Sequence, residues 1–77
     1  MAVGFVLITT EPGREIEVRD EVAKLANVRG QWVVFGMHDL FVKVEADDDN
    51  DLTRCIVNEV RAIDGIAETR TLIGAEI

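Results

Sequence analysis

The residues that follow Met1 place apolar side chains on both faces of a predicted β-strand. Residues 2–10 are rich in β-branched and aromatic residues and end at Glu11-Pro12-Gly13, a sequence typical of a turn. Successive side chains of a strand point to opposite faces, which gives two apolar sets: Val3, Phe5 and Leu7 on one face, and Ala2, Val6 and Ile8 on the other. A strand with one face in water would alternate apolar with polar residues. This strand therefore needs cover on both faces.

The next segment has the spacing of an amphipathic helix over residues 13–27. Its apolar residues recur at i, i+4, i+7 and i+8 and form one stripe, made of Val18, Val22, Leu25 and Ala26. Pro12 suits the helix entry, and acidic residues in the first turn suit the helix dipole. Ile16 lies outside the stripe, so we expect it to face a neighbouring subunit.

A β-hairpin is predicted over residues 29–46, with strands at 29–35 and 38–46. Gly36 lies at the turn, where a tight hairpin needs a positive φ. The acidic run 47–51 that follows lacks the alternate ligands, central Gly and closing Glu of a calcium loop. We interpret it as the N-cap and first turn of a helix.

A second helix is predicted over residues 51–63, and a last strand over residues 66–77. The apolar stripe of this helix consists of Leu52, Ile56, Val60 and Ile63, with Val57 alongside. Asp64-Gly65 closes the helix, with the glycine in its usual C-terminal role.

The element order is βαββαβ, which predicts an α+β fold of the ferredoxin-like class. Two β-α-β units produce one antiparallel four-stranded sheet with the first and third strands central and both helices on one face. The other face then carries the second apolar set of the first strand, and the chain of 77 residues, 48% of them hydrophobic, has nothing left to cover it. We therefore expect a second copy to cover it through a two-fold contact, as in a dimeric α+β barrel.

Composition restricts the partners of this chain, which we interpret as a single domain over residues 1–77. The net charge is −7 without a cluster of Lys or Arg, so direct nucleic-acid binding is not expected. No stretch approaches the ~20 apolar residues of a membrane span, and the N-terminus lacks a leader pattern. The single cysteine, Cys55, excludes an intrachain disulfide, and we expect a cytoplasmic protein.

The reactive residues do not form a predicted catalytic or metal site. His38 and Asp39 are adjacent, and adjacent strand residues point to opposite faces, so they should not act as a general base with its carboxylate. One His and one Cys do not make a recognised metal-ligand set. Cys55 is interpreted as a small residue beside the helix stripe, and Trp32 as a packing residue at a subunit contact. No cofactor is expected.

The turn at Gly36 is the candidate binding site. Gly36 lets the backbone approach a ligand and leaves N–H groups free for a carboxylate, while Asp39 can accept from an ammonium group. Together these groups match the zwitterion of an amino acid. The alternative is that Gly36 serves the hairpin alone and Asp39 stabilises the turn.

Four segments carry a resemblance to a known family: Glu11-Pro12-Gly13-Arg14-Glu15, Gly36-Met37-His38-Asp39-Leu40, Val42-Lys43-Val44-Glu45-Ala46, and Ile63-Asp64-Gly65-Ile66-Ala67-Glu68-Thr69-Arg70-Thr71-Leu72-Ile73. In this order and spacing they resemble the effector-binding domain of the Lrp/AsnC family, also called the RAM domain, across essentially the whole chain. The turn departs from the family's Gly-x-aromatic-Asp pattern because His38 occupies the aromatic position.

The resemblance implies an amino-acid-binding regulatory module rather than an enzyme. In the family, dimers with facing sheets assemble into rings of four or five, here an octamer or decamer, and free amino acids bind between dimers as effectors. The residues that match the family's contacts are Gly36, Met37, His38 and Asp39 in the turn, and Thr69 and Thr71 in the last strand.

The chain begins at the first strand of that domain, so it resembles a stand-alone RAM protein without the helix-turn-helix DNA-binding domain of full-length family members. We expect ligand binding to shift its assembly or its pairing with full-length Lrp/AsnC transcriptional regulators.

Two other functions are compatible with the fold. A small dimeric α+β-barrel enzyme, resembling a monooxygenase or an isomerase, would need a polar cluster between sheet and helices. The first strand offers only apolar side chains and Thr9 on its inward face, which argues against this. A ligand-free oligomerisation module is the other alternative.

Overall fold

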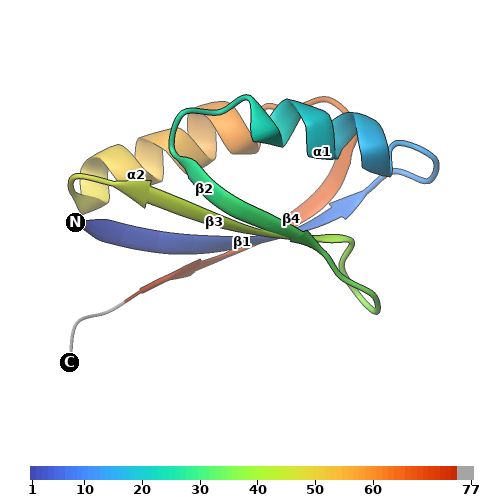
Figure 1. Cartoon of the computed structure of the whole chain (residues 1–77), viewed down its shortest axis with the longest axis horizontal. Helices are drawn as coiled ribbons and strands as arrows, with labels where there is room; N and C mark the ends of the chain where they lie inside the picture. Colours follow the sequence, from blue (N-terminus) through green and yellow to red (C-terminus); the bar gives the residue numbers. More distant parts are fainter. Residues whose placement is uncertain (75–77) are drawn as a thin grey trace.

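The computed structural model describes residues 1–74, and its elements follow the predicted βαββαβ order. The elements are β1 (Ala2–Thr10), α1 (Glu15–Ala23), β2 (Val28–Val33), β3 (Leu40–Ala46), α2 (Asp49–Cys55), η1 (Ile56–Val60) and β4 (Ile66–Ile73). Both helical segments lie on the same side of the sheet (Figure 1). The last strand, predicted over residues 66–77, ends at Ile73, and residues 75–77 lie outside the described residues.

The four strands form one antiparallel sheet in the order β2-β3-β1-β4. The first and third strands are therefore central, as predicted. In the register, Val6 of β1 pairs with Val42 of β3 on one side and with Thr71 of β4 on the other. This is the ferredoxin-like arrangement, and it leaves one face of the sheet without helices.

The core lies between the sheet and the helices. Its fully buried side chains come from both central strands and both helical segments: Val6, Ile8, Val18, Val22, Leu40, Val42, Val44, Leu52 and Val60. Strand β1 alternates strictly between buried and half-buried residues, so Thr10, not Thr9, is its polar residue on the helix side. The expectation that Thr9 faces inward was wrong, because Thr9 shares the open face with Leu7.

Helix α1 is shorter than the predicted range of residues 13–27. It ends at Ala23 because the chain must turn back to join the sheet: the Glu45 amide donates to the Asn27 carbonyl at 2.9 Å, and the Asn27 side-chain amide donates to the Glu45 carbonyl at 2.8 Å. Leu25 still packs on the core from this turn, whereas Ala26 is exposed and does not belong to the buried stripe.

The hairpin strands are also shorter than predicted, at Val28–Val33 and Leu40–Ala46 in place of 29–35 and 38–46. Residues 34–39 form a loop instead, closed by a hydrogen bond from the Val34 amide to the Asp39 carbonyl at 2.9 Å. The expected positive φ at Gly36 is present, at 118°.

The acidic run caps the second helix, as predicted. Asp48 is the N-cap, and its side chain accepts a hydrogen bond from the Asp51 amide at 2.8 Å. Gly65 follows the helical segment with φ 97°, a conformation that suits glycine.

The second helix differs from the prediction in its last turns, which are π-helical. In η1 the Arg61 amide donates to the Ile56 carbonyl, five residues back, at 2.9 Å. Val57, predicted beside the buried stripe, is 47% exposed, and Cys55 is buried in that place. The stripe of Leu52, Ile56 and Val60 is buried as predicted, and Ile63 is partly buried against it.

We expect the Cys55 thiol to be nearly inert in the folded protein. Burial, with Glu59 nearby, raises the pKa of this thiol from about 9 to about 11. At pH 8 the thiolate population, and with it the iodoacetamide reaction rate, should fall about 100-fold relative to the unfolded chain. Because the folded-state pKa is the higher one, the protein should lose stability as the pH rises from about 9 to about 11. Equal alkylation rates with and without denaturant would contradict this.

Candidate functional site

The loop over residues 34–39 is held against the end of β1 by two threonines. The Thr9 hydroxyl donates to the Met37 carbonyl at 3.1 Å, and the same oxygen lies 3.1 Å from Nδ1 of His38. A hydroxyl that donates to a carbonyl can accept from a ring N–H, so this arrangement fits a His38 ring protonated at Nδ1. These contacts fix His38 on the open-face side of the sheet.

Asp39 makes the complementary contacts on the helix side. Its Oδ2 accepts hydrogen bonds from the Thr10 amide at 2.8 Å and from the Thr10 hydroxyl at 3.2 Å. Its own amide donates to the Ile8 carbonyl at 2.8 Å. Within residues 1–74, no protein donor reaches Oδ1 of this carboxylate. Asp39 therefore stabilises the turn and still has one oxygen available.

His38 and Asp39 thus point to opposite faces, one toward Thr9 and the other toward Thr10. The opposite orientations are those predicted for adjacent residues of a strand. The sequence did not reveal their partners, although Thr9 and Thr10 are conspicuous as the polar end of an otherwise apolar strand.

The backbone amides of residues 35–38 have no protein acceptor in the part of the chain that the structure describes. Gly36 lies in the middle of this run, and a Cβ there would meet no atom within 4 Å, so space is open beside it. The neighbouring Phe35 side chain is 97% exposed. Such a run of free N–H groups can hold an anion such as a carboxylate.

Thr69 and Thr71 do not meet this turn within one subunit. They pair with Ile8 and Val6, so both lie on the helix-side face, as period two requires. Their strand, β4, pairs with one side of β1, whereas the turn joins β2 to β3 and contacts the end of β1 from its other side. Thr69 is half-buried and Thr71 is exposed.

The open face of the sheet carries an aromatic cluster. The rings of Phe5 and Phe41 stack with centroids 5.2 Å apart, and the Trp32 ring lies 5.8 Å from that of Phe41. Trp32 and Leu72 are each about half exposed. We call this surface the open face and define it by Val3, Phe5, Leu7, Trp32, Phe41 and Leu72, which the strand register places together.

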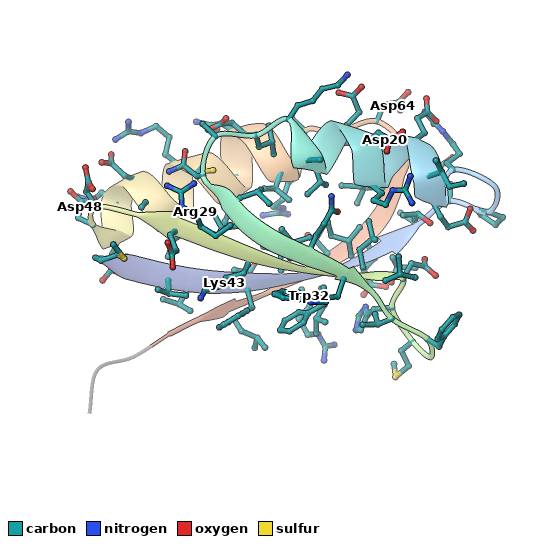
Figure 2. The ribbon with its side chains drawn as sticks, viewed as in Figure 1. Asp20, Arg29, Trp32, Lys43, Asp48 and Asp64 are labelled. Carbon is teal, nitrogen blue, oxygen red and sulfur yellow. The ribbon has the colours of Figure 1, made fainter. Side chains whose placement is uncertain are left out.

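Charge is distributed unevenly between the two sides of the molecule. Figure 2 shows Asp20, Asp48 and Asp64 on the helix side and Trp32 on the opposite side. The acidic residues of the helical segments and their loops outnumber the basic ones. On the open face Lys43 is balanced by Glu45, 3.6 Å away, and the register also places one basic and one acidic residue there, Arg70 and Glu68. Contact between two open faces would therefore bring together surfaces with little net charge.

An arginine joins two of the segments that carry the family resemblance. Arg14 pairs through Nη2 with Asp64 at 3.0 Å and through Nε with Glu17 at 2.7 Å, and the Glu11 amide donates to the Gly65 carbonyl. The hydrogen bonds from Arg14 hold the pKa values of Glu17 and Asp64 below their ordinary range. These groups connect the start of α1 to the start of β4.

The described residues contain neither a group of metal ligands nor a membrane-spanning helix. Within residues 1–74, no three His, Cys, Asp or Glu side chains are grouped as metal ligands. None of the helices in this part of the chain is long and apolar enough to cross a membrane.

Known proteins resemble this chain in sequence and in structure. Residues 3–76 match the Lrp/AsnC ligand binding domain. An uncharacterized HTH-type transcriptional regulator from Pyrococcus abyssi is 39% identical over 71 residues, which are 92% of this chain and 45% of that protein. The chain thus spans about half the length of the curated relatives that it matches.

Solved structures share the fold. The crystal structure of FFRP-DM1 is 36% identical, with a TM-score of 0.92 over 97% of this chain and 100% of that one. The transcriptional regulator NMB0573 from Neisseria meningitidis, solved as an L-Met complex, is 13% identical and shares the fold with a TM-score of 0.80 over 97% of this chain and 50% of that one. By its sequence match over residues 3–76, this chain belongs to the Lrp/AsnC family, as a ligand binding domain.

Proposed function

We propose that this chain is a regulatory module that binds a free amino acid at the 34–39 turn. The observation that carries the proposal is the pairing of free amides at residues 35–38 with the unused Oδ1 of Asp39. The amides of Gly36, Met37 and His38 bind the ligand carboxylate, and Asp39 accepts from its ammonium group. The match to a ligand binding domain and the L-Met complex of a regulator with this fold support the same conclusion.

The site is completed in an oligomer. We propose that two copies pair through the open face, since an apolar surface of this kind is seldom left in water. Where such dimers meet, Thr69 and Thr71 of a neighbouring subunit complete the site, since these threonines lie on the helix-side face and not on the open face. Dimers assemble further into an octamer or decamer, and full-length Lrp/AsnC regulators are the other partners.

The geometry favours binding over catalysis. The two ionisable groups of the turn, His38 and Asp39, are each committed to a threonine on a different face of the sheet. A ligand at the turn would therefore meet one carboxylate and several amides, without a base and an acid placed together as proton transfer requires.

Calorimetric titration with each of the twenty amino acids tests this proposal. We expect heat with one or a few of them at millimolar concentration, because the site matches both charges of the zwitterion. The N-acetylated form of a binding amino acid lacks the ammonium group and should release no heat. If none of the twenty binds, or if acetylation leaves binding unchanged, the proposed site is wrong.

A further inference from the structure

A small cavity opens on the helix side of the turn, between α1 and the end of β2. Its volume is about 280 Å³, near the lower end of the range for ligand pockets. The apolar side chains that line it are Ile16, Val33, Val34, Phe35 and Leu40. These residues come from segments far apart in the sequence, so only the folded chain creates the cavity.

Charged groups lie among these apolar side chains. Asp39 and Arg19 both line the cavity, together with Glu15. The carboxylate of Asp39 is the one with a free Oδ1, and the Arg19 guanidinium pairs in the structure with its neighbour Asp20, at 3.2 Å. The cavity thus presents an acceptor and a cation beside an apolar wall.

The exposure of the apolar residue Ile16 is not explained by packing in the hydrophobic core. Ile16 lies on α1 outside the buried stripe, and 65% of its surface is exposed, although a helix surface usually places polar residues there. Val33 is similarly exposed at the end of β2. Both would lose water contact if an apolar group entered the cavity.

We propose that this cavity receives the side chain of the bound amino acid and that Ile16 and Val33 make the site selective for apolar side chains. The inference rests on the proposed function, because it assumes that the ammonium group is held by Asp39. An amino acid anchored at Oδ1 has its side chain within reach of the apolar wall, while Arg19 offers a second group for its carboxylate. With Asp39 and Arg19 occupied by the ammonium and carboxylate groups of the ligand, a charged or amide side chain would lose water against the apolar wall of Ile16 and Val33, which costs free energy.

The experiment compares ligands on two variants. Leucine, methionine, asparagine, aspartate, lysine and glycine are titrated into the wild type, Ile16→Asn and Val57→Asn by calorimetry. Val57 is the matched control because it is an exposed apolar residue of the other helical segment, away from the cavity. Both substitutions lie on exposed helix surface, so circular dichroism should show unchanged folding.

We expect the wild type to bind leucine and methionine more tightly than asparagine, aspartate and lysine. Ile16→Asn should weaken leucine and methionine about tenfold and leave glycine, which has no side chain, unchanged. Val57→Asn should match the wild type with every ligand.

The failures of the two proposals can be told apart. If no amino acid binds the wild type, the proposed function fails and this inference fails with it. If amino acids bind but polar ones are preferred, or if Ile16→Asn weakens glycine as much as leucine, only the inference is overturned. A change in sedimentation by Ile16→Asn without a change in ligand preference would also overturn it, because the surface would then be a contact between copies.

Discussion

Replacing Phe41 with Asp should break the proposed dimer and leave a monomer. Phe41 lies at the centre of the open face, between the rings of Phe5 and Trp32. A carboxylate there would be buried without a partner when two copies meet. The free energy needed to desolvate this charge is far larger than the free energy that the apolar contact contributes. Sedimentation velocity at micromolar concentration measures the change directly.

Val57→Asp provides the matched control for this prediction. It places the same charge on an exposed apolar residue of the helix layer, so we expect the assembly to persist. The melting temperature of the wild type, but not of Phe41→Asp, should rise with protein concentration, because association stabilises only the folded chain. A well-folded monomer in the wild type would contradict the proposed interface.

Local patterns predicted the fold because each element is specified by its own residues. The βαββαβ order predicted β1 as a central strand, and the strand is central in the sheet. The positive φ at Gly36 and the N-cap at Asp48 follow from short sequences whose geometry few residues can adopt. The family resemblance agreed with the same βαββαβ order.

The sequence could not predict features that depend on distant contacts. Helix α1 ends early because Asn27 bonds to Glu45 in another strand, which no periodicity within the helix shows. The same limit applies to the site, because Asp39 bonds to Thr10, which lies 29 residues away in the sequence. The sequence presented ligand binding and turn stabilisation as alternative roles of Asp39, and this contact makes the two roles compatible. The carboxylate can both stabilise the turn and keep an oxygen for a ligand.

Two substitutions of Asp39 should separate these roles. Asp39→Ala removes the acceptor for the Thr10 amide, and Thr10 is buried. An unsatisfied buried donor costs about 1–3 kcal/mol, which in a domain of this size lowers the melting temperature by about 4 °C or more. Asp39→Asn keeps an acceptor oxygen in the same place, so its melting temperature should stay close to that of the wild type.

Binding should respond differently from stability to these two substitutions. In Asp39→Asn, the side-chain carbonyl would be directed at Thr10, so the side-chain amide group would occupy the position of Oδ1 and present N–H groups to the ligand ammonium. Loss of a charged hydrogen bond weakens binding about 10- to 100-fold, so Asp39→Asn should bind amino acids as poorly as Asp39→Ala does while remaining as stable as the wild type. Calorimetry and thermal melting on the same samples measure both quantities. If Asp39→Asn bound with wild-type affinity, the carboxylate would be structural alone, and the ammonium group would have to be held elsewhere.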